Sequence, residues 1–98
     1  MSELDETIQR LVAKKGVKGV IVLAKEGSAV IRSTVDEDLA AKYARLIGNL
    51  VDTARSTVHA LDDQNDLTFL RVRTKKHEVM ISPDPNYILI VIQNPQEH

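Results

Sequence analysis

The spacing of apolar positions changes several times along the chain, and each change predicts a new element. Leu4, Ile8 and Leu11 recur at helical spacing near the start, and a longer segment repeats that period. Elsewhere the apolar residues run continuously or alternate with polar ones, which is typical of strands. In chain order the pattern predicts a helix, two strands, a second helix and three strands, at 2–15, 16–24, 29–33, 34–61, 66–74, 77–82 and 87–92.

Capping and turn residues support these boundaries. Ser2 is suited to cap the first helix, and Gly16 is suited to end it. Thr34 or Asp36 caps the long helix. Gly27 lies in the turn between the first two strands, where positive φ costs glycine little.

The predicted fold class is α/β, with a single antiparallel sheet and helices on both of its faces. Strands 16–24 and 87–92 are continuously apolar, so both of their faces are covered and they lie at the centre. Tight turns join the other strands as antiparallel neighbours. The predicted sheet is five-stranded with the order 2-1-5-4-3, and residues 1–98 form one domain that ends in a polar tail, 94–98.

The long helix carries more apolar surface than one sheet needs. Its apolar arc is flanked by a strip of small residues, Ala41, Ala44 and Gly48, at spacings of three and four. Two interpretations remain open: the strip packs on its own sheet or faces water, or it contacts the same helix of a second copy across a two-fold axis.

The third strand favours a second copy. It is long and proline-free, yet the predicted order leaves it at an edge, where unpaired backbone groups invite association. Pairing with its own copy would give a continuous ten-stranded sheet. The face opposite the long helix has only the short first helix to cover it, so we expect uncovered apolar surface there that binds an amphipathic helix of a partner.

Composition excludes several classes of function. Lys and Arg number 13 against 14 Asp and Glu, so the chain lacks the basic charge of a nucleic-acid-binding protein. One Phe, two Tyr and no Trp leave little surface for base stacking. Cysteine is absent, the first residues are acidic, unlike a signal peptide, and no apolar run reaches membrane-spanning length. We expect a soluble intracellular protein without nucleic-acid binding or membrane insertion.

The residues that could carry chemistry do not form a recognisable site. His59, His77 and His98 lack metal-ligand spacing. Asp62, Asp63 and Asp66 crowd one loop, where they are suited to capping, because a calcium loop needs alternating ligands, a central glycine and a closing glutamate. Gly16 and Gly19 lack phosphate-loop spacing, and Gly19 instead indicates close packing at a strand start. We expect no enzyme activity, no cofactor and no metal.

Four stretches together resemble the roadblock-type light chains of cytoplasmic dynein over nearly the whole chain. They are KGVKGVIV at 15–22, ARSTV at 54–58, QNDLTFLRVRTKK at 64–76 and LIVIQNP at 89–95. The resemblance implies a profilin-like roadblock fold and a homodimer built from the second helix and third strand. The implied interface comprises Ala41, Ala44, Gly48, Val51, Arg55, Leu67, Thr68, Phe69, Leu70, Arg71, Val72 and Arg73.

The resemblance also implies a partner and a location. A helical stretch of the dynein intermediate chain would bind this dimer, which would help assemble the cargo-binding tail of a microtubule motor in the cytoplasm. Cargo adaptors are further partners that the sequence leaves open. A second hypothesis is a scaffold or regulator of a small GTPase, with Arg71 or Arg73 as an exposed arginine. A third, a small-molecule sensor, would need a sizeable polar pocket.

Overall fold

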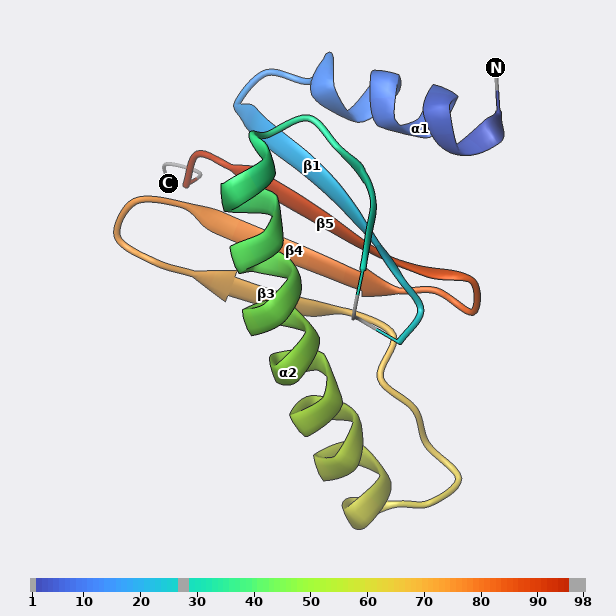
Figure 1. The fold of residues 1–98 in the computed structure, drawn as a ribbon. Coiled ribbons are helices and arrows are strands. Elements are labelled where there is room, and N and C mark those ends of the chain that lie inside the picture. The colour runs from blue at the N-terminus through green and yellow to red at the C-terminus, as the bar shows by residue number, and fades with distance from the viewer. Residues whose placement is uncertain (1, 27–28, 96–98) are drawn as a thin grey trace.

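The computed structural model describes residues 2–26 and 29–95, and Figure 1 shows the fold. The predicted turn residue Gly27 and the end of the predicted tail, 96–98, lie outside the described residues. The predicted order of helices and strands is confirmed. The elements are α1 Glu3–Val12, β1 Val17–Ala24, β2 Val30–Ser33, α2 Glu37–Leu61, β3 Leu70–Arg73, β4 Glu78–Pro83 and β5 Tyr87–Gln93.

The strands form a five-stranded antiparallel sheet in the order β2-β1-β5-β4-β3, as predicted. The two continuously apolar strands, β1 and β5, are neighbours, and Ile21 pairs with Ile90 in their register. Both of these side chains are fully buried. Their burial on the central strands explains why these strands carry unbroken apolar runs.

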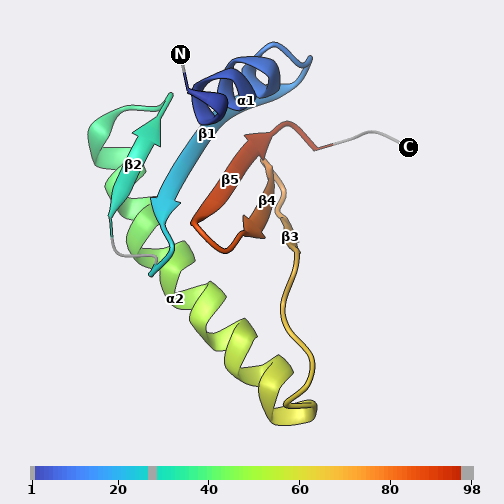
Figure 2. The same ribbon diagram turned by 90° about the vertical axis from the view of Figure 1, so that its right-hand side faces the viewer.

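The two helices cover different parts of the sheet. α2 crosses one face, and its buried side chains pack with those of Ile21, Ile81 and Ile90. We call this the near face. α1 lies beside β1 and β2 on the other side of the sheet from α2, which Figure 2 shows most clearly. This second, far face includes Val20 and Val22, which are also fully buried.

α1 is shorter than predicted. The Ser2 hydroxyl accepts a hydrogen bond from the Asp5 N–H at 3.1 Å, which confirms Ser2 as the cap. The helix ends at Val12, so Gly16 does not terminate it directly. Gly16 instead turns the chain into β1 with φ of +90°, a conformation that L side chains rarely adopt.

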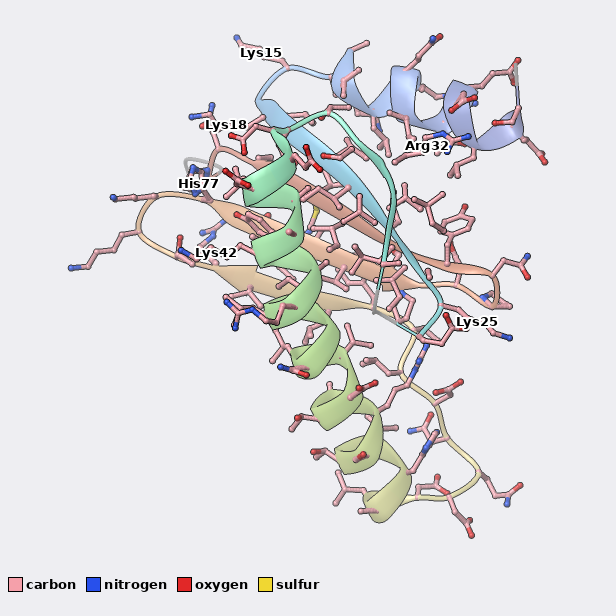
Figure 3. All side chains as sticks on the ribbon, viewed as in Figure 1. Lys15, Lys18, Lys25, Arg32, Lys42 and His77 are labelled. Carbon is pink, nitrogen blue, oxygen red and sulfur yellow. The ribbon has the colours of Figure 1, made fainter. Side chains whose placement is uncertain are left out.

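Arg32 of β2 forms an ion pair that links α1 to the sheet. Its Nε donates to Asp5 Oδ1 at 3.2 Å, and the side chain lies beside α1 in Figure 3. Hydrogen bonding with Ser2 and the Arg32 ion pair together hold the pKa of the Asp5 carboxyl below its ordinary value of 3.8. The contact therefore weakens as the pH falls through this lowered pKa and Asp5 becomes protonated.

The start of α2 settles the choice between two predicted caps. Asp36 Oδ1 accepts from the Leu39 N–H at 2.9 Å, so Asp36 is the N-cap. Thr34 instead extends the contact between β2 and β1, because its hydroxyl accepts a hydrogen bond from the Val20 N–H at 2.9 Å. Glu37 and Asp38 fill the first turn of the helix, where the macrodipole favours negative charge.

β3 is shorter than the predicted strand 66–74. Its register with β4 pairs Leu70 with Ile81, so continuing it backwards would place residue 68 opposite Pro83. Proline has no backbone donor, which ends the pairing at this point. A regular strand over 66–74 would place Leu67 on the opposite side from Leu70. The backbone before Leu70 is irregular, and both side chains pack against the core.

Close packing at Gly19 confirms its predicted role and gives a first test. A Cβ at this position would lie 2.5 Å from Val35 Cγ1. We expect Gly19→Ala to lower the free energy of unfolding by about 1–3 kcal/mol through overpacking, measured by urea denaturation. Gly19→Ala/Val35→Ala should cost less than the sum of its two single variants, because Val35→Ala removes the clashing methyl. Strict additivity of the two variants would contradict this contact.

Candidate functional site

The strip of small residues on α2 faces its own subunit. Ala44, Gly48 and Val51 are buried, and the exposed fraction of Val51 is 1%. Burial within the subunit favours packing of the strip on its own sheet, while the assignment of these residues to a helix–helix contact with a second copy stays a prediction. The alternative that the strip packs on its own sheet is the one observed for Ala44 and Gly48.

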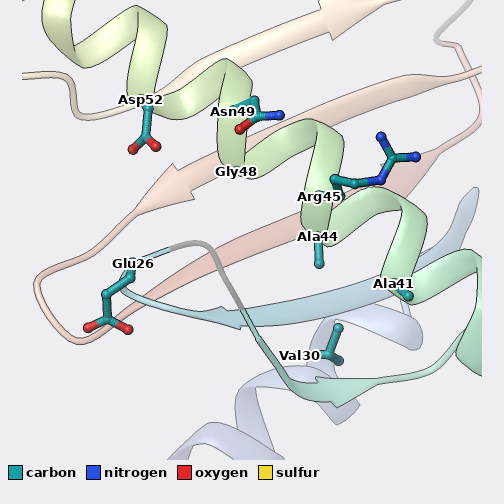
Figure 4. Close-up of a pocket in the computed structure, with 8 residues that line it drawn as sticks. All are labelled: Glu26, Val30, Ala41, Ala44, Arg45, Gly48, Asn49 and Asp52. Carbon is teal, nitrogen blue, oxygen red and sulfur yellow. The ribbon is translucent and has the colours of Figure 1, made fainter.

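Ala41 is exposed but borders a groove within the subunit. The groove has a volume of about 530 Å³ and runs between α2 and β2, with Ala44 and Gly48 on the α2 side and Val30 on the β2 side. Figure 4 shows Ala41 and Val30 at this groove. This shoulder of α2 therefore faces the β2 edge of the sheet and not the β3 edge.

The other shoulder of α2 is apolar and exposed. Leu39, Leu46 and Leu50 have exposed fractions of 40%, 48% and 38%. We call these three residues the apolar shoulder. A hollow of about 300 Å³ is lined by Leu39 and Leu46 of this shoulder and by Tyr43. At 100° per residue, Leu46 lies about 140° around the helix from Ala41, so the apolar shoulder faces away from β2 and towards the β3 side.

The free edge of β3 lies on that same side of the sheet. The Thr74 N–H donates to the His77 carbonyl at 2.8 Å, so Thr74 is bonded toward β4. Because antiparallel bonding alternates along a strand, the backbone groups of Arg71 and Arg73 point outward from the sheet. Phe69, which is 47% exposed, lies just before this edge.

The remaining predicted interface residues are divided between the core and the surface. Leu67, Leu70 and Val72 pack against the core of the subunit. Arg55 is partly buried and borders a hollow with Leu67 and Thr68. The β3 part of the predicted interface thus lies at an accessible edge, while the exposed apolar side chains of α2 on that side are those of the apolar shoulder.

The far face is uncovered beyond α1, although it is less apolar than predicted. In Figure 2, neither helix of the described residues lies over β4 and β3 on this side. On this face Met80 of β4 and Leu89 of the adjoining β5 are partly exposed, and Val91 of β5 is buried. Arg71 of β3 lies opposite Met80 of β4, and Met80 lies opposite Val91 of β5. This row of cross-strand neighbours on the far face changes from charged at the β3 edge to apolar at β5.

A buried carboxylate lies in the neighbouring row. Glu78 is fully buried, and Arg73 Nε donates to its Oε2 at 2.9 Å. Arg71 Nε lies 3.5 Å from Glu78 Oε1, and Gln93 Nε2 donates to the same oxygen at 3.3 Å. We call Arg71, Arg73 and Glu78 the arginine cluster. The two arginine side chains remain 55% and 46% exposed, so the cluster presents positive charge to solvent.

Two of the described residues weighed as catalytic or metal-binding candidates, His59 and Asp62, have structural contacts. His59 Nε2 lies 3.3 Å from Asp66 Oδ1, which links the end of α2 to the following segment. Asp62 Oδ1 accepts from the Gln64 N–H at 3.0 Å, the capping role predicted for this loop. Within 2–26 and 29–95, no three His, Cys, Asp or Glu side chains are grouped to hold a metal. No helix in the same residues is long and apolar enough to cross a membrane.

The sequence profile of the Roadblock/LC7 domain matches residues 3–94 of the chain. The chain belongs to the Roadblock/LC7 domain family. This confirms the family part of the predicted resemblance, while the specific likeness to dynein light chains stays a prediction.

Solved structures of other Roadblock/LC7 domains share the fold. A Roadblock/LC7 domain from Streptomyces avermitilis superposes with a TM-score of 0.82 at 23% identity, covering 95% of this chain and 79% of that one. A second structure of such a domain from the same organism gives 0.72 at 18% identity, with 100% and 85% covered. MglB, described in a tetrameric arrangement, gives 0.76 at 8% identity, with 92% and 69% covered. At these identities the likeness concerns the fold.

Sequence reasoning missed two features of this Roadblock/LC7 domain. The arginine cluster depends on the register that places Glu78 opposite Arg73. The alternation of Arg71 and Arg73 with Leu70 and Val72 was a usable signal, since it places both arginines on the face away from the core. The apolar shoulder was included in the wide apolar arc of the long helix, but the periodicity did not show which side of that arc faces the sheet.

Proposed function

We propose that this Roadblock/LC7 domain is a non-catalytic light chain of cytoplasmic dynein, which forms a homodimer and binds a helical segment of the dynein intermediate chain. In this role it helps assemble the cargo-binding tail, while ATP hydrolysis and motive force belong to other subunits. It would act in the cytoplasm, associated with microtubules through the motor complex.

The observation that carries the proposal is the position of the apolar shoulder beside the free edge of β3. Leu39, Leu46 and Leu50 are exposed on the side of α2 that faces the β3 side, and β3 is the edge strand with unpaired backbone groups. A two-fold axis through the β3 edge would bury both features at once. Two α2 helices would then lie side by side over one continuous sheet.

The far face supports the second half of the proposal. Among the described residues no helix covers β4 and β3 on this face, where Met80 of β4 is partly exposed beside the partly exposed Leu89 of β5. An amphipathic helix could bury these side chains beside α1. Because a dimer presents this face twice, it would join two intermediate chains and raise the effective concentration for their further pairing.

The test combines binding with solution mass. The full chain is mixed with fragments of the dynein intermediate-chain tail, and the mass of each mixture is measured by light scattering. We expect one fragment to bind and form a complex with two light chains and two fragments. A monomeric light chain, or the absence of binding by every tail fragment, would contradict the proposal.

The alternative of a small-GTPase scaffold or regulator depends on an available arginine. Both candidates, Arg71 and Arg73, are engaged with Glu78, which favours a fixed surface over a mobile catalytic arginine. Single-turnover GTP hydrolysis with and without the domain separates the two functions. Acceleration that is lost in Arg71→Ala or Arg73→Ala would favour the regulator.

A further inference from the structure

The stability of the sheet does not require the buried carboxylate of the arginine cluster. Burying a carboxylate is costly unless it is paired, and a buried ion pair often adds no more stability than apolar side chains of similar volume. Glu78 is nevertheless fully buried on the part of the far face that neither α1 nor α2 covers. Its position holds two arginine side chains in place at the surface.

Each arginine keeps donors free for a ligand. Arg73 and Arg71 both approach Glu78 through Nε. Arg71 Nη2 also donates to Met80 Sδ at 3.8 Å, a weak acceptor, so each guanidinium keeps Nη donors that Glu78 does not use. A guanidinium carries five N–H donors in a rigid plane, which suits it to a carboxylate. Two arginines share one buried carboxylate, so the cluster keeps one positive charge in excess.

The neighbouring row adds an apolar contact at a distance that suits a helix. Arg71, Met80 and Val91 are successive partners across β3, β4 and β5. Adjacent strands lie about 4.8 Å apart, so this row spans about 10 Å, close to the width of an α-helix. A helix lying along β4 would contact Met80 and Leu89 on one flank and the arginines on the other.

We propose that Glu78 presets Arg71 and Arg73 as a binding site for an acidic side chain on an amphipathic partner helix. This deepens the proposed function, because it assigns the chemistry by which the far face selects its helical partner. The site remains open in the proposed homodimer, since β3 pairing uses backbone groups while the arginine side chains project from the far face. Two clusters would then lie close together across the dimer axis.

Three synthetic helical peptides test the charge preference of this site. They share one Leu and Ala face and carry Glu, Gln or Lys at the flanking positions, and their affinity for the full chain is measured by fluorescence anisotropy. We expect the Glu peptide to bind at least about tenfold more tightly than the Gln peptide, as for a charge-assisted hydrogen bond. The Lys peptide should bind most weakly. Equal affinities for the three peptides would overturn the proposal.

Matched variants assign the preference to the arginine cluster. R71Q/R73Q should reduce binding of the Glu peptide to the level of the Gln peptide. R10Q/R45Q removes the same charge from exposed positions on α1 and α2 and should change the affinity less than twofold at moderate salt. An equal loss in both double variants would show a general charge effect and reject the site.

Glu78→Gln separates presetting from net charge. The variant makes the surface more positive, so a pure charge effect would strengthen binding of the Glu peptide. Presetting predicts about fivefold weaker binding, because the two guanidiniums lose their common anchor. If Glu78→Gln does not unfold cooperatively, Glu78→Asp, which keeps the charge but shortens the side chain, should weaken binding in the same direction. Stronger binding by a folded Glu78 variant would refute presetting.

The peptide experiment is independent of the intermediate chain. A Glu preference that requires the arginine cluster would stand even if no intermediate-chain fragment bound. Conversely, a fragment that binds R71Q/R73Q as tightly as the natural chain would preserve the proposed function and reject the acidic site.

Discussion

Leu46→Glu should convert the proposed homodimer into a folded monomer. Leu46 is the most exposed residue of the apolar shoulder, so the subunit loses little when it becomes charged. In a two-fold dimer the substitution occurs twice at one interface, where it buries two like charges. We expect a loss of about 4 kcal/mol of dimer stability, or about a thousandfold in dissociation constant. Light scattering at micromolar concentration measures the change in mass.

Ala41→Glu is the matched control for this prediction. It introduces the same side chain at an exposed position of the same helix, on the shoulder that borders the β2 groove. We expect this variant to remain dimeric. Dissociation by Ala41→Glu with an intact dimer in Leu46→Glu would restore the helix strip as the contact and contradict the apolar shoulder.

The sequence was sufficient to predict the order of the sheet because the signals for it are local. The apolar runs of β1 and β5 require cover on both faces, and the short turns leave few ways to arrange the other strands. Both central strands pair as expected, with Ile21 opposite Ile90. Strand and helix ends were predicted less well, as at β3, where the limit on pairing comes from Pro83 of the neighbouring strand.

The candidate site was harder to predict because it depends on how α2 is rotated about its axis. The apolar arc of α2 includes both buried residues, such as Val51, and exposed ones, such as Leu46. Periodicity gives the width of this arc but not its centre, which is fixed by the side chains that fit the sheet. The buried residues of α2 include the small Ala44 and Gly48, so the buried side of the helix is centred away from its exposed leucines.

Val51→Asp should unfold the subunit and not simply dissociate a dimer. Val51 is 1% exposed and packs in the core that α2 forms with the sheet. The variant loses apolar burial and places a carboxylate in the hydrophobic core, which we expect to cost about 4 kcal/mol or more. This is a large fraction of the 5–15 kcal/mol typical of a domain. Circular dichroism and urea unfolding measure the loss.

Thr53→Asp provides the comparison for Val51→Asp, because residue 53 is exposed on the same helix. Its effect on the free energy of unfolding should stay within about 0.5 kcal/mol, as for most surface substitutions. A Val51→Asp protein that unfolds like the natural chain but is monomeric would place Val51 at the interface between copies. Loss of cooperative unfolding in Val51→Asp, together with a folded monomer in Leu46→Glu, would establish that the core side and the partner side of α2 are different surfaces.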